Sequence, residues 1–319
     1  MKVDRARNEA IGRGINTVPD THPWGPIVVN RPPAADRRLL KVVAFNARSG
    51  RSLNQISQRL RLPPFANPDI ILLSEMDWRM TRSYRRETAA ELAAELGLSF
   101  AYIGEFAQRP RVGEPVAFVG NAILSNWPLA DIRVLPLGRS SLRRRMRLRL
   151  GAPAGLAATI TVNRRLLAFG IVHLNSRWDP SGRALQIRQY LDGFPFGLPA
   201  VIGGDLNTTT VELRSSSSFF KAIALSLLRP ARFHNPQRWE PLFECLREAG
   251  FDTTEANVPG ASTFTPTRLI PPIVRPKLDW LAVRGIKPVA GSAAVVPARR
   301  SWFSPRFSDH DFIMCQVEA

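Results

Sequence analysis

Short apolar runs recur along the chain, separated by turns that are rich in glycine, proline and charged residues. Runs of this kind, with many β-branched and aromatic members, are typical of strands that are buried in a sheet. The polar tripeptide NRR at residues 163–165 lies between two such runs and predicts a hairpin. The predicted strands are Leu39–Phe45, Ile70–Leu73, Tyr102–Ile103, Ala117–Leu124, Leu156–Val162, Leu166–Val172, Val201–Ile202, Leu278–Val283 and Phe312–Val317.

Fewer segments show the spacing of an amphipathic helix. We expect Thr81 or Ser83 to cap a helix that runs through ETAAELAAEL, and Gly97 to end it. Since strands outnumber helices and hairpins mix with crossovers, the pattern favours mixed sheets packed together with helices outside, rather than one doubly wound parallel sheet. The remaining predicted helices are one that contains Leu53, Ile56 and Leu60, one over 183–192 and one over 238–249.

The chain divides into a short arm and one long domain. Residues 1–37 are polar and rich in proline and arginine, so we expect a poorly ordered or draped N-terminal arm. Residues 38–319 carry the strand and helix signals and are predicted to form a single domain.

Composition is that of an ordinary globular protein, with 45% hydrophobic residues. Cys245 and Cys315 lie far apart without metal-ligand spacing and are predicted to be buried thiols. No segment resembles a membrane span, and the N-terminus lacks the apolar core of a signal peptide. We therefore expect a cytoplasmic protein that is a monomer.

The net charge of +18 comes mostly from arginine, which supplies 39 of the 44 basic residues. From Ile132 to Trp178 there are ten arginines and no acidic residue. The alternation in LRRRMRLRL predicts a strand with Arg145, Arg147 and Arg149 on one face. Two interpretations stay open, an ordinary exposed strand face and a basic surface that collects a polyanion.

Polar side chains follow several of the predicted strands at the point where each strand ends. Because open α/β sheets place ligand sites at strand ends, we expect these side chains to gather at one site. Their oxygen donors suit Mg2+ or Mn2+, and no Cys/His set competes for zinc. The residues are Asn46 in VVAFNAR, Glu75 in DIILLSE, His173 in IVHLNSR, Asp205 and Asn207 in VIGGDLN, Asp279 in KLDWLAV, and Asp309 and His310 in SDHDF.

These motifs resemble the endonuclease/exonuclease/phosphatase superfamily, which includes deoxyribonuclease I, exonuclease III-type enzymes, inositol-phosphate 5-phosphatases and neutral sphingomyelinases. The resemblance rests on GDLN, LDW, SDH and GNAILS in this sequence, and covers roughly residues 38–319. It implies an α/β (α+β) fold, a four-layer α/β sandwich in which two mixed β-sheets lie face to face and are flanked by helices. It also implies a metal-dependent phosphoesterase.

The resemblance further implies a role for each matching residue. Glu75 resembles the main carboxylate ligand of Mg2+ or Mn2+, assisted by Asn46 and Asp309. Asp205 resembles the residue that orients or deprotonates the attacking water, with Asn207 as its neighbour on the phosphate. His310, paired with Asp279, resembles the histidine that binds the scissile phosphate, and His173 the one that assists the leaving oxygen. Asn121 in GNAILS and Arg177 in IVHLNSR are further candidates for contacts to the substrate phosphate.

The predicted activity is that of a phosphodiesterase, with a nuclease placed ahead of an enzyme that acts on anionic lipid or inositol phosphate. Nucleic acid as substrate fits the positive charge and the arginine-rich stretch. Anionic lipid or inositol phosphate fits the apolar segment 215–230, which follows GDLN and could touch a membrane, cover the substrate or form an ordinary buried helix. PPIVRPKLDW stands where inositol 5-phosphatases carry a PAWCDRIL-like element, which counts against that branch. A catalytically silent binding scaffold is the third class, and the complete set of polar residues counts against it.

Overall fold

Two β-sheets packed face to face make up the body of the protein. The structure is a computed structural model. It describes residues 25–108, 116–138, 149–212, 224–225, 227–265, 270–299, 301 and 304–319.

In the described residues, the first sheet has eight strands and the order β1-β4-β5-β3-β2-β13-β12, with β7 paired to β4. All its neighbouring strands are antiparallel except β2 and β3, which run parallel. The strands are β1 (Ile27–Val29), β2 (Leu39–Ser49), β3 (Ile70–Trp78), β4 (Ser99–Gln108), β5 (Ala117–Ser125), β7 (Arg149–Gly151), β12 (Ala294–Val296) and β13 (Phe312–Glu318).

The second sheet has five strands in the same part of the chain, in the order β11-β10-β9-β8-β6. Strands β9 and β10 run parallel, and the other pairs are antiparallel. Both sheets are therefore mixed, as predicted. The strands are β6 (Ala130–Pro136), β8 (Ala154–Val162), β9 (Arg165–Ile171), β10 (Ala200–Asp205) and β11 (Asp279–Arg284).

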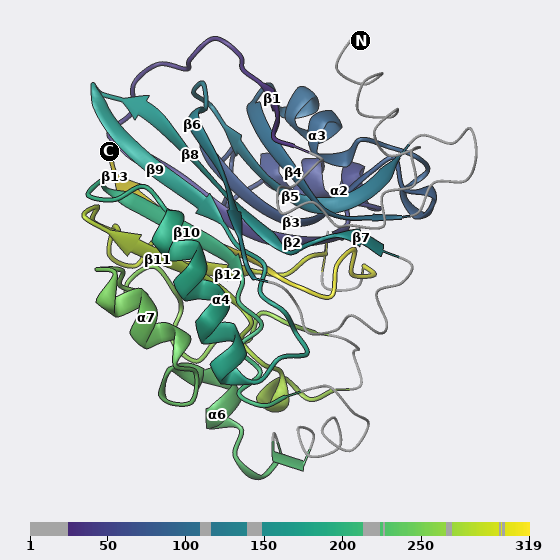
Figure 1. Cartoon of the computed structure of the whole chain (residues 1–319), viewed down its shortest axis with the longest axis vertical. Helices are drawn as coiled ribbons and strands as arrows, with labels where there is room; N and C mark the ends of the chain where they lie inside the picture. The colour runs from purple at the N-terminus through teal and green to yellow at the C-terminus, as the bar shows by residue number, and fades with distance from the viewer. Residues whose placement is uncertain are drawn as a thin grey trace.

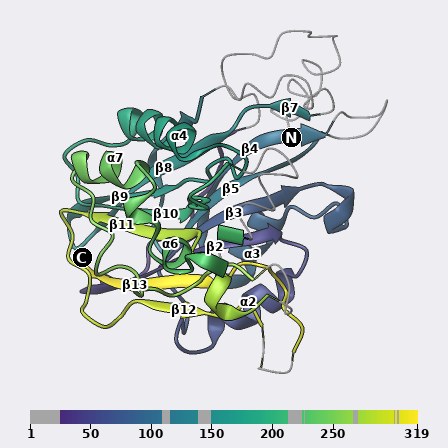
Figure 2. The same ribbon diagram turned by 90° about the horizontal axis from the view of Figure 1, so that it is seen from below.

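Helices cover the two outer faces of the sheets, which gives four layers (Figures 1 and 2). Helices α2 and α3 lie on the first sheet, and α4 and α7 lie on the second. The predicted four-layer α/β sandwich is thus confirmed. The helical elements are α2 (Leu53–Arg61), η1 (Thr81–Ser83), α3 (Thr88–Leu96), α4 (Pro180–Gly193), α6 (Ala231–His234), η3 (Pro236–Arg238), α7 (Leu242–Glu248) and η4 (Pro272–Val274).

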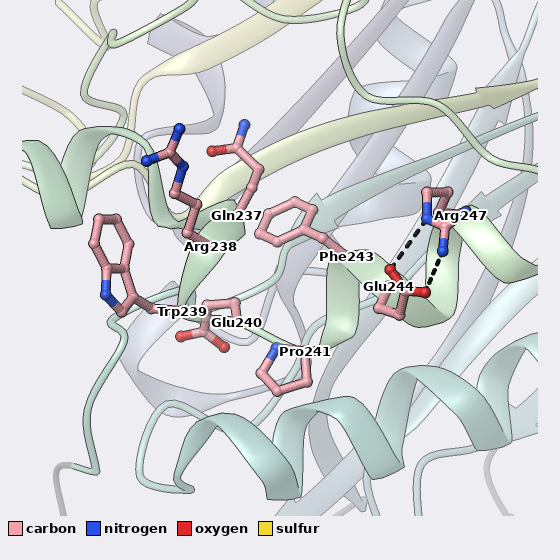
Figure 3. A pocket seen from close by; sticks show the side chains of 8 residues that line it. All are labelled: Gln237, Arg238, Trp239, Glu240, Pro241, Phe243, Glu244 and Arg247. Atoms are coloured by element: carbon pink, nitrogen blue, oxygen red, sulfur yellow. Dashed lines mark hydrogen bonds and ion pairs between the residues drawn. The ribbon is translucent and has the colours of Figure 1, made fainter.

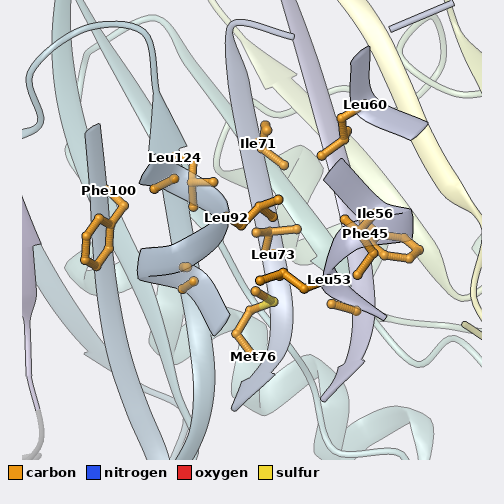
Figure 4. Close-up of a cluster of buried hydrophobic side chains, with 14 of the residues drawn as sticks. Phe45, Leu53, Ile56, Leu60, Ile71, Leu73, Met76, Leu92, Phe100 and Leu124 are labelled. Carbon is orange, nitrogen blue, oxygen red and sulfur yellow. The ribbon is translucent and has the colours of Figure 1, made fainter. Parts of the chain in front are cut away.

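Three hydrophobic cores follow from this layering, because alternate residues of a strand point to opposite faces. In β2, Val43 and Phe45 pack beneath α2 and α3, while Val42 and Ala44 face the second sheet. Figure 4 shows the outer core of the first sheet, where Phe45 lies beside residues of α2. The inner core holds the sheets together, so the strand ends of both sheets meet along one edge.

Several local predictions differ from the structure. Thr81 and Ser83 lie in η1 rather than at a helix cap, and Glu87 is the cap residue of α3. Gly97 ends that helix in a left-handed conformation, as predicted. The helix predicted over 238–249 begins only at Leu242, because Pro236 and Pro241 favour short turns before it.

Other elements of the chain extend or confirm the predictions. Strands β1, β6 and β12 were not predicted, and β1 pairs part of the proposed N-terminal arm with β4. Cys245 and Cys315 are buried free thiols, as expected. Arg149 lies in β7, whereas the arginines at 143, 144, 145 and 147 lie outside the described residues, as does most of segment 215–230. Across the described part of the chain, no helix is long and apolar enough to span a membrane.

The two glycines before Asp205 allow the backbone to approach its neighbours closely. A Cβ at Gly203 would lie 2.7 Å from Leu281 Cδ2, and one at Gly204 would overlap the carbonyl oxygen of Val172. Gly204 also has φ +138°, which side chains rarely tolerate. These glycines therefore set the position of Asp205 at the end of β10.

We expect Gly204→Ala to lower the free energy of unfolding by about 3 kcal/mol or more, because a backbone clash adds to the unfavourable φ. Urea denaturation measures this change. Gly197→Ala is the matched control, since Gly197 also has a positive φ but no atom lies within 4 Å of the added Cβ. It should cost about 1 kcal/mol. Equal losses in the two variants would contradict the steric role of Gly204.

Candidate active site

The predicted polar residues come from strands of both sheets that end at the same edge. Asn46 pairs with Ser74 across the parallel β2–β3 ladder, which brings Asn46 next to Glu75. Asp205 and Asp279 are opposite each other at the end of β10 and the start of β11. Since the inner core joins the sheets, these two pairs meet in one cluster.

Asp205 lies at the centre of the cluster and is only 2% exposed. Its Oδ2 accepts a hydrogen bond from Asn46 Nδ2 at 3.1 Å. The same oxygen lies 3.6 Å from Nε2 of His173 and 3.6 Å from Nε2 of His310. One carboxylate oxygen is therefore shared by an amide from the first sheet and two imidazoles.

His310 is held by a second carboxylate on the far side of its ring. Its Nδ1 lies 2.8 Å from Asp279 Oδ2, so the ring directs Nε2 towards Asp205. Burial opposes protonation of His310, but the charges of Asp279 and Asp205 outweigh this effect and raise its pKa to about 10. His310 is consequently a cation at neutral pH, with Nε2–H available to an anion.

The pKa of Asp205 is set by opposing effects of burial and neighbouring charge. Burial raises its pKa to about 6, in opposition to His310 and His173, whose positive charges favour the carboxylate. Its Oδ1 accepts the backbone N–H of Asn207 at 3.0 Å. Asn207 has a left-handed backbone with φ +50°, and its Nδ2 donates to the carbonyl oxygen of Leu174 at 2.8 Å. The geometry leaves Asp205 ionised, yet close to its pKa, at neutral pH.

Asn46 and Glu75 form the part of the site that best fits a divalent cation. Asn46 Nδ2 donates to Glu75 Oε1 at 3.2 Å as well as to Asp205, so one amide group lies between two carboxylates. Glu75 is half-buried and has φ +55°, at an irregularity in the pairing of β3 with its neighbours. A hard cation would satisfy the converging oxygens better than an amide does. Asp205, Asp279 and His310 form a second group whose ligand atoms lie within 4.8 Å of one another.

Asp309 reaches the rim of the same cluster. Its side chain is 26% exposed and lies 3.8 Å from Nε of Arg48. The preceding residue, Ser308, donates from Oγ to the carbonyl oxygen of Asn46 at 2.9 Å. This bond fixes the loop that carries Asp309 and His310 against the end of β2.

The two candidate phosphate contacts are not brought into the cluster. Asn121 is fully buried in β5, and its Nδ2 donates to the carbonyl oxygen of Ala154 at 2.9 Å. Arg177 is exposed in the loop after β9, where its backbone N–H donates to Asn175 Oδ1. Within the described residues, neither side chain forms a hydrogen bond or an ion pair with Asp205 or either histidine.

Glu105 is a residue of this region that the sequence analysis missed. It is 4% exposed in β4, and its Oε1 accepts the backbone N–H of Ala154 at 3.1 Å. Burial raises its pKa to about 7, although the positive charge of His173 acts in the opposite direction. In turn, the charges of Asp205 and Glu105 outweigh burial and raise the pKa of His173. Glu105 lies inside a strand rather than at its end, so the strand-end pattern could not identify it.

Comparison with known proteins agrees with this fold. The model of the Endonuclease/Exonuclease/phosphatase family matches residues 43–310. No curated protein matches the chain.

Solved structures share the fold at low sequence identity. An endonuclease/exonuclease/phosphatase from Beutenbergia cavernae DSM 12333 has a TM-score of 0.58 and 18% identity, over 88% of this chain and 72% of that one. A family protein from Leptotrichia buccalis C-1013-b has a TM-score of 0.59 and 13% identity, over 88% of this chain and all of that one. D. rerio TDP2, complexed with a single-strand DNA product, has a TM-score of 0.53 and 13% identity, over 89% of this chain and 100% of that one.

The family model covers most of the chain, including every residue from Asn46 to His310 that forms the cluster. The Glu75 carboxylate beside Asn46 and the buried group of Asp205, Asp279 and His310 fit the divalent-metal dependence of that family's phosphoesterases. The chain belongs to the Endonuclease/Exonuclease/phosphatase family, whose members are metal-dependent phosphoesterases.

Proposed function

We propose that this protein is a phosphodiesterase that hydrolyses nucleic acid by in-line attack of water. The observation that carries the proposal is the position of the Asp205 carboxylate, 3.6 Å from the Nε2 atoms of both His173 and His310. In this arrangement the carboxylate can accept a proton from an attacking water, while the two imidazoles can donate to an anionic phosphate. The family assignment supports the reaction class, and the substrate is the further step.

Asp205 is assigned the role of orienting and deprotonating the water. With a pKa of about 6 it is mostly ionised at neutral pH, yet basic enough to accept a proton. Asn207, whose backbone N–H holds Asp205 Oδ1, is proposed to contact the phosphate with its side chain. Their shared loop would thus place nucleophile and phosphate together.

His310 is assigned to the scissile phosphate. Its Nδ1–H donates a hydrogen bond to Asp279, which leaves Nε2–H to donate to a phosphoryl oxygen. Because its pKa is about 10, the ring stays positive throughout the physiological range and stabilises the charge that develops on that oxygen. His173, whose pKa is also raised, is proposed to protonate the leaving oxygen.

Glu75 and Asn46, assisted by Asp309, are the residues that would hold the Mg2+ or Mn2+ ion. When bound, such an ion neutralises phosphate charge that would repel the nucleophile. Asn46 joins the ion site to Asp205 through its hydrogen bonds to both carboxylates. The alignment of water with the phosphate would therefore depend on Asn46 as well as on Asp205.

Nucleic acid is favoured as substrate by charge. The chain carries a net +18, and a polyanion gains affinity by releasing counterions on such a surface. Arg48, whose side chain is 62% exposed, lies beside Asp309 at the rim of the site and is suited to a neighbouring phosphate. The single-strand DNA product bound to D. rerio TDP2, a protein of the same fold, supports the same class of substrate.

An anionic lipid or inositol phosphate is the second candidate. Leu227 and Leu228, in the described part of segment 215–230, are 62% and 80% exposed. Two exposed leucines in a protein with a large positive net charge are compatible with contact to an anionic membrane surface. Vesicles therefore belong in the same assay as nucleic acid.

We expect Asp205→Asn and His310→Ala each to lower turnover by about 10²- to 10⁴-fold, because each removes a group that acts on the reacting atoms. Plasmid DNA, single-stranded RNA and phosphoinositide or sphingomyelin vesicles are incubated in parallel with Mg2+, Mn2+ or EDTA. EDTA should abolish hydrolysis. Glu248→Gln, in an exposed carboxylate of α7, is the control and should retain native rates. Near-native turnover in either active-site variant would refute the assigned roles.

Binding of single-stranded DNA by the Asp205→Asn variant should weaken steeply with salt. If about three phosphates are contacted, affinity should fall by roughly tenfold or more between 50 and 200 mM salt. Fluorescence anisotropy at several salt concentrations gives the slope. Salt-independent binding, together with hydrolysis of vesicles alone, would replace nucleic acid by lipid as the substrate.

Stability of the metal-free protein should depend on pH through Glu105. Its pKa is about 7 in the folded state, against 4.5 for an ordinary glutamate, so the folded state binds more protons between these values. The contribution of Glu105 to stability is thus full below pH 4.5 and is lost as pH rises through 7, by about 3 kcal/mol. Urea denaturation in EDTA should show Glu105→Gln gaining stability relative to wild type from pH 5 to pH 8. A constant difference between the two proteins would contradict this linkage.

A further inference from the structure

Helix α4 carries two buried polar side chains that reach the loops around the active site. Arg183 and Gln186 are both fully buried, and their spacing of three residues puts them on one face of the helix. A buried guanidinium is costly unless every donor has a partner. The partners of these two side chains therefore indicate what the helix face is built to hold.

Arg183 binds groups from three separate segments. Its Nε and Nη2 donate to the two carboxylate oxygens of Glu240, at 3.1 and 2.5 Å, and the pair is fully buried. Its Nη1 donates to the carbonyl oxygen of Trp178, and Nη2 lies 3.5 Å from the carbonyl oxygen of Val211. Trp178 follows His173 along the chain, and Val211 follows Asn207, so one guanidinium contacts both loops.

Glu240 extends this contact to the backbone of the second loop. Its Oε1 accepts the N–H of Thr210 at 2.7 Å. Thr210 has φ +61°, an unfavourable conformation for a threonine. Arg232 adds bonds to Thr210 Oγ1 and to its carbonyl oxygen, at 3.0 and 2.8 Å. The left-handed turn after Asn207 is thus fixed by two charged side chains.

Gln186 holds the first loop in the same way. Its Oε1 accepts the N–H of Asn175 at 2.9 Å, and its Nε2 donates to the carbonyl oxygen of Leu137 at 3.1 Å. The two loops are also joined directly, because Asn207 Nδ2 donates to the carbonyl oxygen of Leu174. The loops that carry His173 and Asn207 are therefore hydrogen-bonded to each other and to side chains of α4.

We propose that the buried Arg183–Glu240 pair and Gln186 are positioning residues, which fix the loop after His173 against the loop after Asp205. Their contribution is to keep Asn207 and His173 at set positions around Asp205. A buried ion pair adds little net stability compared with apolar packing, which makes a geometric role the better account of it. The inference rests on the proposed roles of Asn207 and His173.

The first test is hydrogen exchange in Glu240→Gln. Glutamine keeps the shape and can still accept from Thr210, but it loses the charge that binds Arg183. Glu244→Gln is the matched control. Glu244 is close to Glu240 in the sequence, but it forms an exposed ion pair with Arg247 (Figure 3). Figure 3 also shows the Glu240 carboxylate pointing away from that pair.

Exchange in Glu240→Gln should accelerate at least tenfold for the amides of 174–178 and 207–212, with β2 and β8 unchanged. Glu244→Gln should leave all these segments as in wild type. Uniform acceleration throughout the protein, or none in the two loops, would overturn the inference. This measurement needs no substrate, so it decides the matter even where the wild-type protein hydrolyses none of the compounds tested. If Glu240→Gln fails to fold, Gln186→Met is measured for 174–178 with the same criteria.

The second test is a double-mutant cycle on an accepted substrate. Glu240→Gln should lower kcat about tenfold and change KM less than threefold. In the Asn207→Ala background, the same substitution should lower kcat less than threefold, because the Glu240 carboxylate bonds directly to the loop that carries Asn207, whereas Arg183 and Gln186 still hold the loop after His173. A full tenfold loss in both backgrounds would show a merely structural role and overturn the proposal. Failure of wild-type hydrolysis would count against the proposed function and leave the exchange result standing.

Discussion

Burial of the Asp205 carboxylate between the two sheets is the constraint on which the active site depends. Asp205 ends β10 directly after Gly203 and Gly204, and the first of these packs against Leu72 of the first sheet and Leu281 of the second. The close approach of the sheets removes water from the carboxylate and raises its pKa. Such a group is tolerated in the folded state only if donors and positive charges surround it. An amide from the first sheet and the two histidines supply them.

The same arrangement explains why the remaining polar residues form pairs. The charge of Asp279 keeps His310 protonated next to the Asp205 carboxylate. The charges of Asp205 and Glu105 likewise raise the pKa of His173. Each charge raises the cost of burying the next unless an opposite charge is close. The cluster therefore alternates carboxylates and imidazoles, and its carboxylates outnumber the two histidines, so a divalent cation would neutralise the excess negative charge. Under the proposed function, a phosphodiester would meet positive N–H groups on one side and a base on the other.

The sequence pattern predicted mixed sheets with helices outside and polar residues gathered at strand ends, because both depend on short-range patterns, and the family resemblance implied the four-layer sandwich. Alternation in β2 identifies two buried faces, and polar residues such as Asn46 and Asp205 stand where the apolar runs end. The prediction failed where partners distant in sequence decide the outcome. Glu105 is buried because Ala154 binds it from 49 residues away, and no local pattern marks that contact. The cap of α3 was misplaced because Thr81 and Ser83 are equally good turn residues, and η1 uses them.

In the proposed mechanism, selectivity among phosphoesters has to come from outside the buried cluster, because His310 and Asp205 are assigned to features that all phosphodiesters share. The exposed residues at the rim would then distinguish one substrate from another. Arg48 lies beside Asp309 and can bind a second phosphate, which a polynucleotide offers and a simple ester lacks. Phe264 packs against His310 with ring centroids 4.8 Å apart and is half-buried, so it presents an apolar edge next to the histidine that is proposed to bind the scissile phosphate. A nucleic-acid strand, which offers both phosphates and flat bases, would use these two features together under the proposed function.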